Sequence, residues 1–170
     1  AEGGGYTSSF SNSDVAMQHI QLDSLSGEAV PSDAVDPACV PQKPRILVVD
    51  DSPICQKMVN KALGSRFCMD FASNGLEAVE KLTYKPCLFN AVLMDLRMPI
   101  MDGIEATAHI RDKLDLKTLP IIALTAEHGD LIRQEVFAAG ATDLMNKPAK
   151  TTELVTMLHK HLREGNRVTG

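Results

Sequence analysis

The sequence predicts an α/β domain in which helices cover both faces of a parallel sheet. Five short apolar runs follow one another between residues 44 and 165, and a segment with helical periodicity comes after each run. Strands that alternate with helices form parallel sheets, because each helix returns the chain to the edge where the next strand begins. The order of elements therefore indicates a doubly wound sandwich of five βα units.

The predicted strands are short and continuously apolar, as strands buried on both faces are. They span residues 46–49, 67–72, 91–94, 121–124 and 141–145. The predicted helices span residues 52–63, 73–82, 102–114, 129–140 and 151–162. Ser52 is placed to cap the first helix, with Pro53 at its first position, and Gly140 is placed to end the fourth helix.

The chain divides near residue 43. Residues 1–43 are rich in glycine, serine, aspartate and proline, and we expect a disordered linker there. A short helix over residues 15–25 is compatible with the apolar residues of that stretch. Residues 44–165 form the predicted domain, and residues 166–170 are expected to be a disordered tail.

Composition argues against several classes of protein. The net charge of −5 disfavours general nucleic-acid binding, and no apolar run reaches the ~18 residues of a membrane span. The first residues lack the features of a signal peptide, so we expect a cytoplasmic domain, with any membrane attachment supplied by a region absent here. From the start without methionine we expect either an excised fragment or residues left by cloning. The four cysteines lack metal-binding spacing and are expected to be reduced thiols.

Polar residues stand where the predicted strands end. Asp50 and Asp51 follow the first strand, Asp95 the third, Thr125 the fourth and Lys147 the fifth. The carboxyl ends of parallel strands lie at one edge of the sheet, where ligands bind in such folds. We therefore expect three carboxylates, a hydroxyl and an ammonium group to converge there.

The adjacent aspartates require a cation close to them. Two like charges 4 Å apart repel each other by roughly 4 kcal/mol at an effective dielectric of 20. Carboxylate oxygens suit Mg²⁺, which binds proteins through one or two carboxylates and keeps several waters. A further carboxylate beside Mg²⁺ and a lysine is a candidate nucleophile toward a phosphoryl group, because both cations neutralise the phosphoryl oxygens. The sequence thus predicts a magnesium-dependent site for phosphoryl chemistry.

Four motifs, in this order and spacing, carry a family resemblance: "VVDD", "VLMDLRMPIMDG", "IIALTA" and "NKP". Together they resemble the receiver domain of two-component response regulators, over about residues 44–163. The resemblance implies a flavodoxin-like fold with strand order 2-1-3-4-5. It also implies that the domain takes a phosphoryl group from a phosphohistidine and changes conformation to relay a signal.

The resemblance assigns roles to the residues at the strand ends. Asp95 is implied to be the phosphoacceptor, Thr125 the switch hydroxyl and Lys147 the group that pairs with the phosphoryl oxygens. The implied Mg²⁺ ligands are Asp50, Asp51, Asp95 and the backbone carbonyl of Arg97. In this family the peptide bond before the proline that follows the lysine is cis, which here is the bond between Lys147 and Pro148.

The segments "MDGIEAT" and "LPIIALTA" are most similar to receivers of hybrid histidine kinases, and the chain looks like the C-terminal receiver of such a kinase. The implied partner is a histidine kinase or histidine phosphotransfer domain. It is expected to dock on the first helix near Ile54, Cys55 and Met58 and on the loop at Lys147–Pro148. Neither nucleic acid nor a membrane is an expected partner, and the chain is compatible with a monomer.

Two positions depart from the family pattern. Leu144 stands three residues before the lysine, where receivers usually have the aromatic partner of the switch hydroxyl. The output is then expected to use backbone shifts. Ser52 and Cys55 stand where hybrid-type receivers often have asparagine, which affects the helix on which partners dock.

Two alternatives compete with a phosphorylation switch. A phosphorylation-independent pseudo-receiver normally lacks an acid or the lysine, and this chain has them all. A phosphatase similar to haloacid dehalogenases needs a D-x-D motif, but Asp95 is followed by Leu96 and Arg97. Whether the chain is an enzyme stays open, because receivers assist their own phosphorylation and dephosphorylation and the chain is compatible with a fragment of a kinase. The domain's histidines are interpreted as solvated helix residues.

The sequence also predicts a contact at the rim of the site. Arg97 lies two residues after Asp95, and Glu127 lies two residues after Thr125. Because both loops cross the same edge of the sheet, the cation and the carboxylate should face each other over the pocket. The alternative is that both side chains point into solvent.

Overall fold

The computed structural model describes residues 43–165. Their elements alternate strictly: β1 (Arg45–Val49), α1 (Pro53–Leu63), β2 (Cys68–Ala72), α2 (Gly75–Tyr84), β3 (Ala91–Asp95), α3 (Gly103–Asp112), β4 (Ile121–Thr125), α4 (Asp130–Ala138), β5 (Asp143–Asn146) and α5 (Thr151–Gly165). The strands pair in parallel in the order β2-β1-β3-β4-β5, which confirms the predicted fold class and strand order. Residues 1–42 of the predicted linker, including its helix over 15–25, and the C-terminal tail lie outside the described residues.

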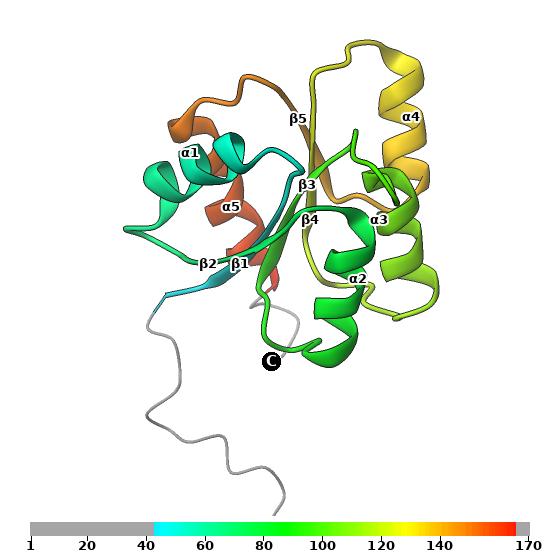
Figure 1. The fold of residues 1–170 in the computed structure, drawn as a ribbon, viewed down its shortest axis with the longest axis horizontal. Coiled ribbons are helices and arrows are strands. Elements are labelled where there is room, and N and C mark those ends of the chain that lie inside the picture. The colour runs from blue at the N-terminus through cyan, green and yellow to red at the C-terminus, as the bar shows by residue number, and fades with distance from the viewer. Residues whose placement is uncertain (1–42, 166–170) are drawn as a thin grey trace, which may run out of the picture. The chain divides into compact units, whose positions relative to one another are not determined.

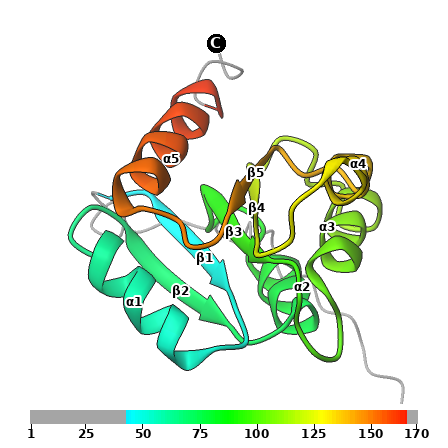
Figure 2. The ribbon, with the colours of Figure 1, turned by 90° about the horizontal axis from the view of Figure 1, so that it is seen from above.

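The sheet is the middle of three layers (Figure 1). Seen from above, α1 and α5 cover one face of the sheet and α2, α3 and α4 cover the other (Figure 2). Successive side chains of a strand point to opposite faces. In β1, Ile46 and Val48 therefore pack under α1 and α5, while Leu47 and Val49 pack under α2 and α3. Both faces are covered, which explains why the central strands are apolar runs.

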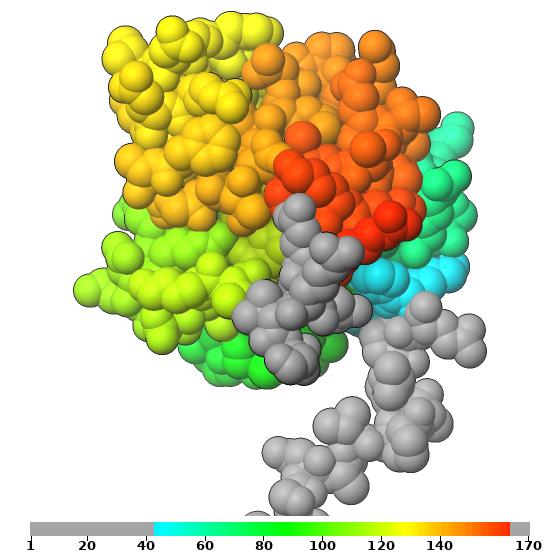
Figure 3. Space-filling model, turned by 180° about the vertical axis from the view of Figure 1, so that it is seen from behind, coloured from blue at the N-terminus to red at the C-terminus, as the bar shows by residue number. Residues whose placement is uncertain are grey.

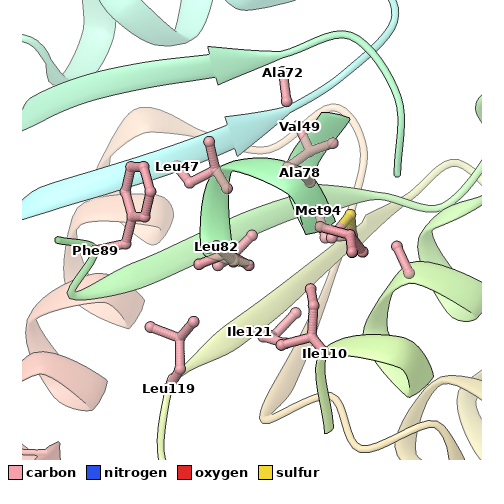
Figure 4. Close-up of a cluster of buried hydrophobic side chains, with 13 residues drawn as sticks. Leu47, Val49, Ala72, Ala78, Leu82, Phe89, Met94, Ile110, Leu119 and Ile121 are labelled. Carbon is pink, nitrogen blue, oxygen red and sulfur yellow. The ribbon is translucent and has the colours of Figure 1, made fainter. Parts of the chain in front are cut away.

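The core between the sheet and α2 and α3 is a continuous apolar cluster (Figure 4). Leu47, Leu82, Met94, Ile110 and Ile121 belong to it, and all five are fully buried. Burying a side chain of this size contributes roughly 1.5–3 kcal/mol. This layer gives the strand ends a fixed support.

The ends of the helices agree with the expected capping residues. Ser52 accepts a hydrogen bond from the Cys55 backbone N–H at 3.4 Å, and Pro53 opens α1. Gly140, with φ of 97°, follows α4 in the left-handed conformation that glycine tolerates best.

The start of β5 differs from the prediction, which placed it at residue 141. The backbone N–H of Ala141 donates to the Val136 carbonyl at 3.2 Å, so this residue closes the end of α4. Ladder pairing with β4 begins only at Asp143. The strand is therefore two residues shorter at its start than the apolar run indicates.

Arg111 is a buried cation, only 8% exposed. It lies at the edge of the sheet where β4 and β5 begin, opposite the edge where the strands end. Its guanidinium donates to the carbonyls of Gly140 at 2.8 Å, of Leu119 at 2.7 Å and of Leu116, and to the Thr142 hydroxyl at 3.3 Å. Burial lowers the Arg111 pKa. The contacts tie α3 to the two loops that lead into β4 and β5.

Among the described residues, no helix combines the length and the apolar character that crossing a lipid bilayer requires.

Candidate functional site

Three carboxylates meet at the C-terminal edge of the sheet, as predicted. Asp50 and Asp51 follow β1, and Asp95 is the last residue of β3. One oxygen atom of each carboxylate lies within 4.8 Å of the other two. Asp50 and Asp95 are buried, whereas Asp51 is exposed. The cluster therefore has two buried members and one that is open to solvent.

Lys147 neutralises part of this negative charge. Its Nζ lies 2.9 Å from Oδ2 of Asp50 and 2.9 Å from Oδ2 of Asp95. Burial lowers the Lys147 pKa, but hydrogen bonds and charge interactions with both carboxylates raise it more, so the net pKa is raised. The group is thus cationic at neutral pH, and it offsets part of the repulsion between the carboxylates. The peptide bond between Lys147 and Pro148 is cis, as the resemblance implied.

Asp50 and Asp51 differ in how their carboxylates are held. Asp50 also accepts a hydrogen bond from the Ser52 backbone N–H through Oδ1, at 2.9 Å. The Asp51 carboxylate makes no side-chain hydrogen bond or ion pair within residues 43–165. A cluster that offers only oxygen atoms, with the Asp51 carboxylate free of other side-chain contacts within residues 43–165, suits hard divalent cations.

Glycine at the start of α3 allows the chain to pass close to Asp95. The Gly103 N–H donates to the Leu96 carbonyl at 3.0 Å. A Cβ atom on Gly103 would lie 2.1 Å from the Asp95 carbonyl oxygen, which no side chain tolerates. The close contact fixes the end of β3 and with it the backbone that carries the central carboxylate.

Thr125 and Glu127 link the end of β4 to the loop that follows it. The Thr125 hydroxyl is buried and accepts a hydrogen bond from the Glu127 backbone N–H at 3.0 Å. Through Oε1, Glu127 accepts a hydrogen bond from Nε of Arg97, and this bond raises the Arg97 pKa and lowers the Glu127 pKa. The predicted contact between these two side chains is confirmed, although they remain 64% and 43% exposed.

A groove of about 450 Å³ opens beside the carboxylate cluster, between α1 and α5. Its apolar lining includes Cys55, Met58 and Leu154, and Lys147 lies at its polar end. Ile54 and Met58 on α1 are largely exposed. The residues expected to contact a partner are therefore accessible or line this groove.

Leu144 lies on β5, the strand at one edge of the sheet. Figure 3 shows the face of the molecule on which α4, in yellow, and α5, in orange to red, lie. Its side chain is half-buried against a small cluster formed by Leu96, Ala123, Ile132 and Val136. Leu144 thus packs between β4 and α4, next to the element that ends in Thr125.

The sequence pattern did not indicate a role for Gln56. Its side-chain amide donates to the carbonyls of Asp50 at 2.7 Å and of Ala72 at 3.2 Å. A single amide on a helix carries no motif, because its partners are backbone atoms brought close only by the fold.

Comparison with known proteins identifies relatives over the described domain. The family model described as response regulator receiver domain matches residues 46–159. The transcription factor SKN7 of Chaetomium thermophilum is 35% identical over 133 residues, which cover 78% of this chain and 17% of that protein. Hybrid signal transduction histidine kinase B of Dictyostelium discoideum is 39% identical over 131 residues, which cover 69% of this chain and 7% of that protein. The chain thus spans less than a fifth of the length of either relative.

Solved structures share the fold. The chemotaxis protein CheY4 of Vibrio cholerae is 31% identical with a TM-score of 0.64, covering 69% of this chain and 98% of that one. The receiver domain of a sensor histidine kinase from Pseudomonas aeruginosa is 33% identical with a TM-score of 0.64, covering 71% of this chain and 98% of that one. The second structure has a magnesium ion coordinated in its active-site cleft.

Proposed function

Because the chain belongs to the response regulator receiver domain family, we propose that it takes a phosphoryl group from a phosphohistidine onto Asp95. The observation that carries this proposal is the ammonium group of Lys147, held 2.9 Å from the carboxylates of both Asp95 and Asp50. A pseudo-receiver is not supported, because every acid and the lysine are present and adjacent.

The proposed reaction is a displacement at phosphorus. A carboxylate oxygen of Asp95 forms a bond to phosphorus, the bond from phosphorus to the imidazole nitrogen breaks, and its electron pair stays on the imidazole. Lys147 stabilises the negative charge on the phosphoryl oxygens, since a fixed ammonium in a partly buried site needs little reorganisation. The product is an acyl phosphate on Asp95.

The proposed cofactor is Mg²⁺, held by Asp50, Asp51, Asp95 and the backbone carbonyl of Arg97. The fit rests on the oxygen-only ligands and on the solvent-exposed, unengaged carboxylate of Asp51. When bound, Mg²⁺ supplies positive charge to the phosphoryl oxygens. Asp50 keeps its bond from the Ser52 N–H, which orients that carboxylate.

The proposed switch is the Thr125 hydroxyl. It now accepts a hydrogen bond from the Glu127 N–H, and turning it toward a phosphoryl group on Asp95 would release that bond. The following loop then shifts and carries α4 with it. Leu144 is not an aromatic side chain, so the proposed output is a displacement of backbone without a rotating ring.

The proposed partner is a histidine kinase or histidine phosphotransfer domain, and the similarity to hybrid histidine kinases supports this class. It would contact α1 through Ile54, Cys55 and Met58 and the loop at Lys147–Pro148. The groove between α1 and α5 reaches from this helix to Lys147, so a partner seated there brings its histidine close to Asp95.

The function is tested by incubating the chain with Mg²⁺ and a small phosphodonor such as acetyl phosphate. Intact mass spectrometry should detect one added phosphoryl group that alkali removes. Asp95→Asn should add none, whereas Asp115→Asn, which changes an exposed surface carboxylate, should behave as wild type. Uptake by Asp95→Asn at the wild-type rate would show that another residue is the acceptor.

A further inference from the structure

The side chain of Gln56 closes a ring of hydrogen bonds at the ends of β1 and β2. Its Nε2 donates to the Asp50 carbonyl at 2.7 Å and to the Ala72 carbonyl at 3.2 Å. The Asp50 backbone N–H donates to the same Ala72 carbonyl at 3.1 Å. One amide on α1 thus joins the ends of two strands immediately before the acidic pair leaves the sheet.

This ring fixes the peptide between Asp50 and Asp51. The Asp50 carbonyl belongs to that planar peptide unit, so a hydrogen bond to its oxygen sets the orientation of the Asp51 N–H as well. The Asp51 carboxylate has no partner of its own in the part of the chain that the structure describes. Its direction therefore depends on the backbone, and the backbone depends on Gln56.

We infer that Gln56 is a positioning residue that aims the Asp51 carboxylate at the proposed Mg²⁺ site. This inference rests on the proposed function, since the cation is the one proposed there. Gln56 touches neither the cation nor the phosphoryl group and acts only through the strand-end peptide.

Glutamine suits this task better than amino acids of similar size or of different charge. Its amide offers two N–H donors from one nitrogen, which matches two carbonyl acceptors. Glutamate would place a carboxylate against those carbonyls, and asparagine is one methylene too short to keep both distances. Methionine has a similar length and no donor, so it removes the bonds with little change in packing.

The first test compares Gln56→Met with Gln134→Met, an exposed position on α4. Calorimetric titration with Mg²⁺ should give about 10-fold weaker binding for Gln56→Met, the lower end of the cost of losing groups that orient metal ligands. Gln134→Met should bind Mg²⁺ as wild type does. At saturating Mg²⁺, the rate of phosphorylation of Gln56→Met should return to within about two-fold of wild type.

Mg²⁺ binding by Gln56→Met that is as tight as wild type would overturn the inference. If the melting temperature without Mg²⁺ is lower in that case, Gln56 supports only the fold.

A second test uses the wild-type chain and does not depend on how the variant folds. In nuclear magnetic resonance spectra, the Gln56 side-chain amide and the Asp51 backbone amide should shift together during Mg²⁺ titration, with one midpoint. A Gln56 signal that stays still while Asp51 moves would refute the coupling. If the wild type does not bind Mg²⁺, both the proposed cation site and the inference about Gln56 are wrong. If the wild type binds Mg²⁺ and the two signals do not shift together, only the inference about Gln56 is wrong.

Discussion

Arg97 and Glu127 form an ion pair that joins the loop after β3 to the loop after β4 at the rim of the carboxylate cluster. The backbone of Glu127 also donates to the Thr125 hydroxyl. Glu127 therefore connects Arg97 to Thr125, the residue with the proposed switch hydroxyl. We interpret the pair as a lid over the proposed phosphoryl site.

The lid should control how long the phosphoryl group survives on Asp95. Arg97→Ala and Glu127→Ala should each change the rate of phosphoryl loss by about two- to five-fold, because either change opens the site to water. The double variant should fall short of the product of the single effects, since one change already opens the lid. Decay of labelled phosphoprotein at low and high salt measures all four chains.

Salt provides the control for this prediction, because exposed ion pairs are screened. The wild-type rate should move toward that of the single variants as salt increases. Multiplicative single effects that salt does not change would show that the two residues act independently.

Asp51→Asn should separate cation binding from folding. Asp51 adds a negative charge beside Asp50 without a partner of its own, so its neutralisation removes repulsion in the absence of metal. We expect a melting temperature without Mg²⁺ equal to or above that of the wild type, loss of the stabilisation by Mg²⁺ and loss of phosphorylation. A clearly lower melting temperature without Mg²⁺ would contradict this account.

Lys147→Met should destabilise the domain without metal by about 1–3 kcal/mol. It leaves two buried carboxylates without their cation, which costs 3–5 kcal/mol in fully buried pairs, and Lys147 is 26% exposed. Addition of Mg²⁺ should stabilise this variant more than the wild type, because both cations neutralise the same carboxylates. Urea unfolding with and without Mg²⁺ measures both effects. Lys150→Met, which alters an exposed pair with Glu153, is the matched control and should change little.

Asp143 should contribute stability that is lost in acid. Burial raises its pKa, but hydrogen bonds from His161, the Leu144 N–H and Lys160 outweigh this, so the net pKa is lowered. A carboxyl group with a lowered folded-state pKa stabilises the fold above its unfolded pKa and loses that contribution as pH falls through the folded value. The difference in unfolding free energy between wild type and Asp143→Asn should therefore decrease as pH falls below the unfolded pKa of the carboxyl group, and vanish once the carboxyl group is protonated in the folded state as well. A difference that persists at the lowest pH would contradict the role of the charge.

Arg111→Met should destabilise the domain by about 2–4 kcal/mol, because it leaves buried carbonyls without donors. Arg111→Lys should recover only part of this loss, since an ammonium cannot reproduce the planar fork that contacts Gly140, Leu116 and Leu119. Phosphorylation at low temperature should stay near wild type, because these contacts lie at the opposite edge of the sheet. Thermal unfolding tests the first claim, and Arg133→Met on the α4 surface is the control.

The central strands could be predicted to within a residue because both of their faces are buried. Apolar side chains then follow one another without interruption in β1, β3 and β4. The error at β5 arose from Ala141, an apolar residue after α4 whose N–H bonds back to the helix at Val136. Apolar character marks burial there, but hydrogen bonding decides where the strand begins.

The site residues at strand ends could be predicted, since topology alone brings Asp50, Asp95 and Lys147 to one edge of the sheet. Side chains that hydrogen-bond to backbone carbonyls could not be predicted. Gln56 and Arg111 bind carbonyls from distant segments and leave no periodic signal. The interpretation of His161 as a solvated residue is wrong for the same reason: it is buried with Nε2 3.0 Å from Oδ2 of Asp143.

The ion pair between Lys147 and Asp50 joins residues 97 positions apart. At about 5–20 residues per second, a ribosome adds the lysine roughly 5–20 seconds after the aspartate. A nascent or prematurely terminated chain that lacks β5 exposes the acidic pair without its ammonium group and lacks an edge of the sheet. The ammonium group can therefore pair with Asp50 and Asp95 only when translation of the domain is nearly complete.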